Sequence, residues 1–182
     1  MVKVLKNTDE LDSLIKILKS ESAVAGYRLR NAHIRSGRLL GEMINSNENL
    51  GGKKIGIIVM VKSGLFLATG LAEALEVKGC RVDLILSSDS DIDLKKYDRV
   101  IIADGVINTG STVRGFINVL KLNNPIIAVS VLPKDMCSKL NDLNIYSCRL
   151  SAHSYVGSGN KKIDHGYGPA TSYRLFSSEF YK

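Results

Sequence analysis

The chain has 182 residues, of which 45% are hydrophobic and 24% are charged, a composition that excludes a wholly disordered protein. A chain of this length buries about 70% of the surface that its unfolded form exposes, so it needs no disulfide or metal ion to hold a core together. The net charge of +7 favours a polyanionic partner, either nucleic acid or a small phosphorylated ligand, although a generally basic surface explains the charge equally well.

Neither a membrane span nor a signal peptide is expected. No apolar run reaches the roughly 18–20 residues that cross a bilayer, and residues 1–14 lack the apolar segment of a secretory signal. The three cysteines are widely separated and form no Cys-x-x-Cys pair: Cys80, Cys137 and Cys148. We therefore expect reduced thiols, a cytoplasmic protein and no membrane partner.

Two helices are expected first along the chain. Residues 8–20 place apolar side chains at helical spacing, and Thr8 or Asp9 can cap them. Residues 24–45 carry a second apolar stripe beside four arginines: Arg28, Arg30, Arg35 and Arg38. These arginines most simply form a solvated helix face, and the alternatives are a dimer interface or a phosphate contact.

From residue 54 onward, the sequence predicts alternating strands and helices. Short apolar runs predict strands at 54–61, 81–86, 99–104, 126–132 and 145–150. Helices are expected between them, at 64–79, 111–122 and 134–143. Continuous apolar runs are typical of strands buried on both faces of a parallel sheet, and the alternation indicates right-handed βαβ units. The predicted fold class is therefore α/β, an open parallel sheet flanked by helices.

The C-terminal segment, residues 151–182, differs from the rest of the chain. It is rich in Gly, Ser and Tyr and has little periodicity, so it is either disordered or covers a functional site. Its four tyrosines and two phenylalanines favour order. We expect a single domain over residues 1–182, with a core at roughly 24–150 and a small irregular C-terminal hood at roughly 151–182.

The most informative stretch is RVIIADGVINTGST, residues 99–112. An apolar strand leads to Asp104, and a loop with glycines and hydroxyl side chains then opens a helix. Ligands of open parallel sheets bind beyond the carboxyl ends of the strands. Backbone N–H groups and hydroxyls at a helix N-terminus suit a phosphate, and a carboxylate beside them can bind sugar hydroxyls. The simpler interpretation is a capped helix start, and neither a Walker A nor a G-x-G-x-x-G pattern is present.

Residues 104–112 after this apolar strand resemble the binding motif for phosphoribosyl pyrophosphate (PRPP) of type I phosphoribosyltransferases. Three further stretches resemble the uracil phosphoribosyltransferase family, in the right order: RLRNAHIRSGRLLGEM at 28–43, IIVMVKSGLFLATGL at 57–71 and RLF at 174–176. The resemblance covers most of the chain. It implies a type I phosphoribosyltransferase-like sheet and transfer of ribose 5-phosphate from PRPP to a base.

The resemblance also implies a role for each loop. Asp104 would hold the ribose hydroxyls and offset the positive charge that develops in the transition state. The 5′-phosphate would bind Asn108, Thr109, Gly110, Ser111 and Thr112. Pyrophosphate, carrying the cofactor Mg²⁺, would bind Lys62, Ser63 and Gly64, and no metal site made of protein residues is expected. The base would lie against hood residues, for which the candidates are Tyr167, Gly168 and Tyr173.

The sequence departs from the family pattern at three places. Lys62 stands where the pyrophosphate loop usually has an arginine, and lysine lacks the planar bidentate fork of arginine. Only about 40 residues separate that loop from Asp104, which is short for the flexible hairpin of the family. The hood reads GPATSYR at 168–174 and lacks the two aspartates with which the family reads uracil.

The leading hypothesis is a Mg²⁺-dependent phosphoribosyltransferase, most simply for uracil, that forms a homodimer or a higher homo-oligomer. The alternatives are a different base, or a regulatory protein that binds PRPP or a nucleotide without turnover. Nucleic acid is not expected as a partner, because that interpretation rests on net charge without a recognised module. The histidines show no metal-ligand spacing: His33, His153 and His165.

Overall fold

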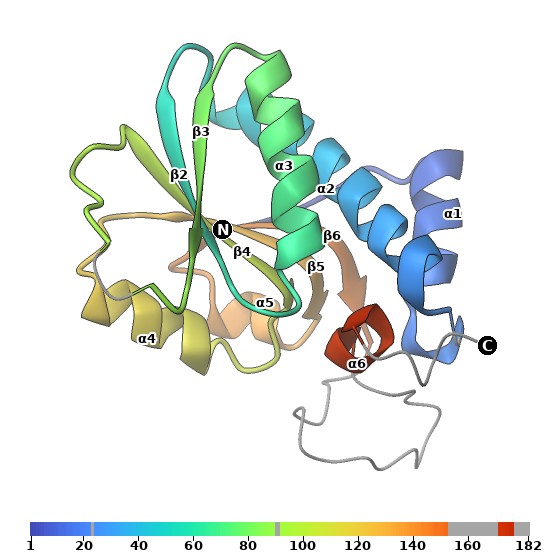
Figure 1. The fold of residues 1–182 in the computed structure, drawn as a ribbon. Helices are drawn as coiled ribbons and strands as arrows, with labels where there is room; N and C mark the ends of the chain where they lie inside the picture. The colour runs from blue at the N-terminus through green and yellow to red at the C-terminus, as the bar shows by residue number, and fades with distance from the viewer. Residues whose placement is uncertain (23, 90–91, 153–170, 177–182) are drawn as a thin grey trace.

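The computed structural model describes residues 1–22, 24–89, 92–152 and 171–176 (Figure 1). The described residues form one six-stranded parallel sheet in the order β1-β6-β5-β4-β2-β3. Its strands are β1 (Val2–Val4), β2 (Lys54–Val59), β3 (Arg81–Leu86), β4 (Arg99–Val106), β5 (Ile126–Pro133) and β6 (Asn144–Ser151). The predicted open parallel α/β sheet is therefore confirmed, and the five predicted strands are present. The short strand β1 was not predicted.

Helices cover both faces of the sheet (Figure 1). One face carries α1 (Asp9–Leu18), α2 (Gly26–Glu48) and α3 (Leu65–Val77), and the other carries α4 (Ser111–Val119) and α5 (Met136–Lys139). A 3₁₀ turn, η1 (Ser20–Ser22), joins α1 to α2. The helix expected at 134–143 is shortened to α5, because the chain turns at residues 141–142, Asn and Asp, which favour turns.

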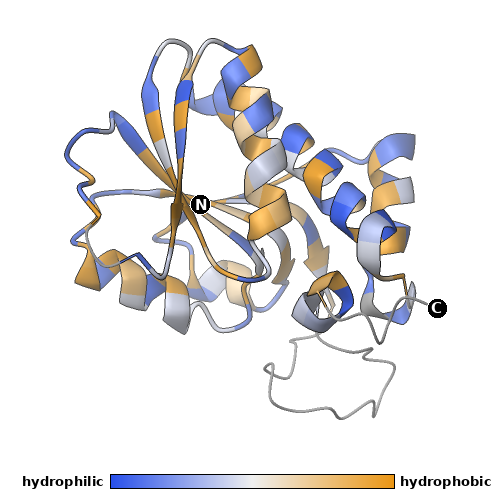
Figure 2. Cartoon of the chain, in the orientation of Figure 1, coloured by the Kyte–Doolittle hydropathy of each residue, from blue (hydrophilic) through white to orange (hydrophobic). Residues whose placement is uncertain are grey.

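Successive residues of the central strands enter two different cores. Ile57 and Ala103 pack with α2 and α3, whereas Ile58 and Ile102 pack with the α4 side of the sheet, and all four are fully buried. Side chains alternate along a strand, so a strand covered on both faces is apolar at consecutive positions. Figure 2 shows hydrophobic residues along the strands of the sheet.

The amino ends of the strands are joined by one carboxylate, that of Glu48 at the end of α2. Its Oε1 accepts hydrogen bonds from the Tyr146 hydroxyl at 2.6 Å and from Asn144 Nδ2 at 2.9 Å. Arg99 lies 3.0 Å from Oε2, and Lys3 lies 3.6 Å from Oε1. Burial alone raises the pKa of this carboxyl, but the two hydrogen bonds and two positive charges outweigh it and lower the pKa to about 2. Glu48 is thus held ionised by four neighbours on three strands.

The short helix α6 (Thr171–Phe176) lies near the carboxyl ends of β5 and β6 (Figure 1). The guanidinium of the fully buried Arg174 donates to the carbonyl oxygens of Leu18 at 2.9 Å, Val24 at 3.0 Å and Lys19 at 3.1 Å. Phe176 packs on Phe66 of α3, with ring centroids 5.5 Å apart. These contacts fix α6 to the corner between α1, α2 and α3. The rest of the expected hood, 153–170 and 177–182, lies outside the described residues.

Two further expectations concern the described chain. All three cysteines are free thiols. No helix among the described residues is both long enough and apolar enough to span a membrane.

Candidate functional site

The loops that follow β2 and β4 meet at the carboxyl edge of the sheet. The two strands are parallel neighbours, with Val59 opposite Ala103. The pairing continues past the end of β2, where the backbone N–H of Met60 donates to the Ala103 carbonyl at 2.9 Å. The Ser63 hydroxyl then donates to Asp104 Oδ1 at 2.6 Å. The structure therefore brings together the two segments on which the sequence interpretation rests.

Glycines let these two loops touch. A Cβ added to Gly64 would lie 2.2 Å from the Ala103 carbonyl oxygen, and one added to Gly105 would lie 2.8 Å from the Cβ of Ser63. Both distances are far below van der Waals contact, so a side chain at either position would push the loops apart. The close approach is what places Ser63 within hydrogen-bond distance of Asp104.

Asp104 is a half-buried carboxylate without a cationic neighbour. Burial raises its pKa, while hydrogen bonds from the Ser63 hydroxyl and from the backbone N–H groups of Val106 and Gly105 oppose that rise. Among the described residues, no lysine, arginine or histidine lies within ion-pair distance of it. A carboxylate in this state has unused acceptor capacity for hydroxyl groups and favours a positive charge beside it.

The N-terminus of α4 is arranged as an open turn. Gly110 precedes the helix with φ of +77°, a left-handed conformation that few side chains tolerate, and the Leu140 side chain lies 2.8 Å from where its Cβ would be. The Thr109 and Ser111 hydroxyls lie 3.0 Å apart, and the Ser111 N–H donates to Thr109 Oγ1 at 3.4 Å. Thr109, Ser111 and Thr112 are exposed, so their hydroxyls and the first N–H groups of α4 can face an anion.

The remaining predicted residues fall into two groups. Lys62 is exposed on the loop that carries Ser63, and Asn108 is half-buried between Asp104 and Thr109. Both lie at the carboxyl edge with the rest of the predicted phosphate site. Tyr173 lies on α6 and is 49% exposed. Tyr167 and Gly168 lie outside the described residues, so the predicted base contacts stay predictions.

A narrow cavity of about 10 Å³ lies next to Asp104, and sequence reasoning did not single it out. It is lined by Leu18, His33, Gly105, Val106, Ser130, Val131, Arg149 and Thr171. His33 is 2% exposed, and its Nδ1 lies 3.2 Å from the Ser130 hydroxyl. Its Nε2 has no hydrogen-bond partner among the described residues. Burial, together with the nearby charge of Arg174, lowers the pKa of His33 to about 3, so its imidazole is neutral.

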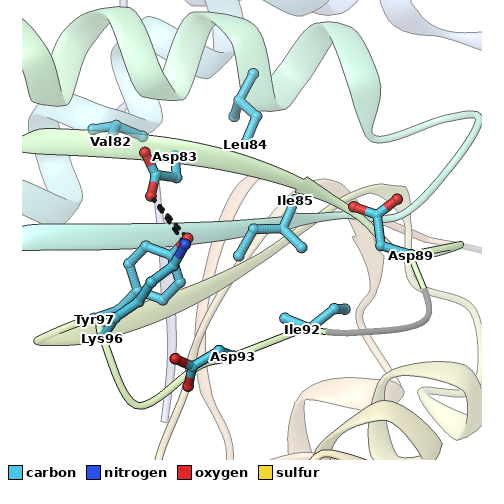
Figure 3. Close-up of a pocket in the computed structure, with 9 residues that line it drawn as sticks. All are labelled: Val82, Asp83, Leu84, Ile85, Asp89, Ile92, Asp93, Lys96 and Tyr97. Atoms are coloured by element: carbon cyan, nitrogen blue, oxygen red, sulfur yellow. Dashed lines mark hydrogen bonds and ion pairs between the residues drawn. The ribbon is translucent and has the colours of Figure 1, made fainter.

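A wider groove of about 480 Å³ lies along β3, the edge strand of the sheet (Figure 3). Its polar groups bond to one another: the Tyr97 hydroxyl donates to Asp83 Oδ2 at 2.8 Å, and Lys96 lies 3.9 Å from the same oxygen. The carboxylates of Asp89 and Asp93 accept the backbone N–H groups of Leu86 and Lys95 respectively. The described residues contain no cluster of His, Cys, Asp and Glu that could hold a metal ion. The groove contains none of the predicted site residues, so the candidate site is the edge around Asp104.

Comparisons with known proteins support the fold more than the activity. No family model matches the chain, and no curated protein is similar to it. Among solved structures, the AQ2163 protein from Aquifex aeolicus has a TM-score of 0.70 and 14% identity, over 98% of this chain and 99% of that chain. A likeness of this extent shows a shared fold.

Two purine enzymes are also structural neighbours. A hypoxanthine-guanine-xanthine phosphoribosyltransferase has a TM-score of 0.49 and 19% identity, over 67% of this chain and 75% of that one. A purine phosphoribosyltransferase from Pyrococcus horikoshii has a TM-score of 0.47 and 21% identity, over 68% and 86%. Scores below 0.5 do not establish a common fold, and identities this low do not establish a common activity, so function has to be argued from the residues at the carboxyl edge.

Proposed function

We propose that this protein is a phosphoribosyltransferase, which transfers the ribose 5-phosphate of PRPP to a nucleobase and releases pyrophosphate. The observation that carries the proposal is the hydrogen bond between Ser63 and Asp104. It joins the two loops that resemble the pyrophosphate loop and the PRPP motif, at the edge of a parallel sheet where ligands bind. A capped helix start alone does not require a second loop bonded to the acid before it.

Each part of the edge suits one part of PRPP. The open turn at Gly110 and the exposed hydroxyls of Thr109, Ser111 and Thr112 would hold the 5′-phosphate at the N-terminus of α4. Asp104 would accept hydrogen bonds from the ribose hydroxyls. The ammonium of Lys62, with Ser63 and the backbone of Gly64, would hold the pyrophosphate.

Mg²⁺ fits this site as an ion bound by PRPP and not by protein residues. Lys62, Ser63 and Gly64 contribute a cation, a hydroxyl and N–H groups, none of which is the hard anionic oxygen that Mg²⁺ prefers. The phosphate oxygens of PRPP are such ligands. When bound there, Mg²⁺ would neutralise charge on the departing pyrophosphate.

The chemistry follows from this placement. A lone pair of a base nitrogen forms a bond to the anomeric carbon, and the bond from that carbon to the pyrophosphate oxygen breaks with its electron pair. The proton of the base nitrogen passes to solvent. Positive charge develops on the ribose ring during the exchange, and the carboxylate of Asp104, which has no cation beside it among the described residues, would stabilise that charge. The loops contribute by holding the reactants in line.

The base that we propose is uracil, on the resemblance of residues 28–43, 57–71 and 174–176. The alternative is a different base, because the hood sequence lacks the aspartates of the uracil family. We further propose a cytoplasmic homodimer or higher homo-oligomer, as that resemblance implies.

The test is to incubate the purified full chain with PRPP, Mg²⁺ and each nucleobase in turn, and to measure nucleotide and pyrophosphate together. We expect the two products in equal amounts with at least one base, uracil first. If no base gives a nucleotide, the proposed phosphoribosyltransferase activity is refuted. Calorimetry with PRPP alone would then separate a regulatory protein, which binds PRPP, from a chain that does not bind it.

A further inference from the structure

The narrow cavity beside Asp104 has small residues at two of its strand positions, Gly105 and Ser130. On the sheet face that meets α2, Ala103 is followed two positions later by Gly105, and Ala128 by Ser130. These side chains leave space at the carboxyl ends of β4 and β5. His33 of α2 enters that space from the helix layer and reaches Ser130, 3.2 Å away.

One buried polar atom at this cavity, Nε2 of His33, lacks a hydrogen-bond partner among the described residues. His33 itself is buried and neutral. An unpaired buried polar atom destabilises a fold, so one that persists calls for an explanation such as a bound ligand or water. In either tautomer, the pair of His33 and Ser130 can offer a donor or an acceptor to a further group.

The size of the cavity limits what can enter it. A volume of about 10 Å³ is close to the smallest that holds a single water molecule. A whole nucleobase ring does not fit, whereas one carbonyl oxygen or amino group projecting from its edge does. The apolar wall formed by Leu18 and Val131 would keep bulk water away from that contact.

The cavity is also in reach of the reacting ligand. Gly105 and Val106, which line it, directly follow Asp104 along β4. A ribose held by Asp104 would therefore lie at the same strand end as the cavity. Thr171 of α6, which belongs to the segment expected to form the hood, also lines the cavity.

We propose that one polar group on the edge of the nucleobase enters this cavity and is hydrogen-bonded by His33 and Ser130, which makes these two residues determinants of base specificity. The inference rests on the proposed phosphoribosyl transfer and names the part of the chain that reads the base. In the family that the sequence resembles, hood aspartates read the base, and this chain lacks them. The inference gives His33 and Ser130 that role instead. Buried hydrogen-bonding groups reject a base that cannot pair with them, because they would then remain unpaired.

The test compares His33→Leu and Ser130→Ala with the wild type, using the full chain, PRPP, Mg²⁺ and the panel of bases. We expect kcat/KM for the preferred base to fall about tenfold to a hundredfold, and its margin over other bases to shrink, because a buried hydrogen bond is lost. KM for PRPP should stay unchanged, since neither side chain contacts the predicted phosphate loops. The control is Ser36→Ala: Ser36 is buried three residues further along α2 and does not line the cavity.

The outcomes separate this inference from the proposed function. A wild type that forms no nucleotide with any base refutes both. Turnover with unchanged base preference in a folded His33→Leu protein, checked by thermal unfolding, refutes the inference alone. If His33→Leu does not fold, Ser130→Ala decides: an unchanged KM for the base and an unchanged preference overturn the proposal, and a selective rise in that KM supports it.

Discussion

Two carboxylates, one at the amino ends of the strands and one at the carboxyl ends, have opposite surroundings. At the amino edge, Glu48 is surrounded by Lys3, Arg99, Asn144 and Tyr146, and its pKa is lowered to about 2. At the carboxyl edge, Asp104 accepts a side-chain hydrogen bond from Ser63, and burial raises its pKa. A carboxylate saturated by its own chain contributes to stability. One left without a cation keeps lone pairs that a ligand can use.

Histidine and hydroxyl groups follow the same division. His33 keeps an unpartnered nitrogen at the carboxyl edge, in the described part of the chain, and Thr109 and Ser111 are exposed there. The Tyr146 hydroxyl at the amino edge is bound to Glu48 at 2.6 Å. The difference indicates where the chain accepts a local energetic cost, as binding sites commonly do, and where it does not.

The largest expected effect is on activity at the carboxyl edge. Asp104→Asn preserves shape but removes the negative charge, so we expect turnover with PRPP to fall about a thousandfold, equal to about 4 kcal/mol of transition-state stabilisation. The free energy of unfolding should not fall, because the variant no longer buries a charge without a counter-ion. Steady-state kinetics and urea unfolding measure the two quantities.

The control for this variant is Asp98→Asn. Asp98 accepts the backbone N–H of Lys54 at 2.7 Å, at the amino end of β2 and far along the strand from the site. Its turnover should equal that of the wild type. An Asp104→Asn protein with wild-type turnover would show that the carboxylate at the strand end has no part in the reaction.

The second expected effect is on stability at the amino edge. Glu48→Gln keeps one acceptor but loses the charge that pairs with Arg99 and Lys3, so the free energy of unfolding should fall by about 2 kcal/mol. Turnover per folded molecule should not change. Urea unfolding and active-site titration check the two statements. Glu73→Gln, which breaks the exposed pair with Arg38, is the control and should cost less than about 1 kcal/mol. Equal losses in both variants would remove the distinction between a saturated network and a surface pair.

Local sequence patterns predicted much of this architecture. Strands such as Lys54–Val59 and Ile126–Pro133 were recognisable because burial on both faces favours apolar residues at consecutive positions. The strand Val2–Val4 was not, since it has three residues and pairs with residues 145–147 at the far end of the chain. Residues beyond 152 could be assigned to a hood by composition, and only the helix at 171–176 lies in the described chain.

The candidate site was predictable to the extent that each loop has its own pattern. Lysine, serine and glycine marked Lys62–Gly64, and an acid followed by glycine and hydroxyl residues marked Asp104–Thr112. The bond that joins the loops spans 41 residues, and the contact of His33 with Ser130 spans 97. His33 is a lone histidine on an amphipathic helix, so nothing near it in sequence distinguishes it from a core residue. Its environment is created by small residues on two strands that only the sheet brings together.

A third effect, on the pH dependence of stability, compares the two edges directly. The pKa of His33 is lowered from 6.5 to about 3, so the unfolded chain takes up a proton below pH 6.5 and the folded chain does not. The contribution of neutral His33 to the free energy of unfolding is therefore complete above pH 6.5 and is lost as the pH falls from 6.5 towards 3. Glu48, lowered from 4.5 to about 2, loses its contribution as the pH falls from 4.5 towards 2. Each slope is at most about 1.4 kcal/mol per pH unit.

Urea unfolding at a series of pH values separates these two windows. His33→Leu should flatten the decline between pH 6.5 and 4.5, where Glu48 does not contribute, and should lessen the slope from 4.5 to 3. Glu48→Gln should leave the decline above pH 4.5 unchanged and lessen the slope below it. If the stability of the wild type were constant from pH 6.5 to 4.5, His33 would have to be protonated in the folded chain. The neutral imidazole assigned to the cavity would then be wrong.

The smallest expected effect separates Gly115, inside α4, from Gly110, which precedes that helix. Gly115 is exposed in the middle of α4, and a Cβ there would meet nothing within 4 Å. Gly115→Ala should therefore raise the free energy of unfolding by about 0.5–1 kcal/mol through helix propensity, with KM for PRPP unchanged. Gly110→Ala should lower the free energy of unfolding and raise KM for PRPP, because the φ of Gly110 is +77° and Leu140 occupies the space that its Cβ would need. A stabilised Gly115→Ala with weaker PRPP binding would mean that the anion contacts the body of α4, and the open turn at its N-terminus would then lose its assigned role.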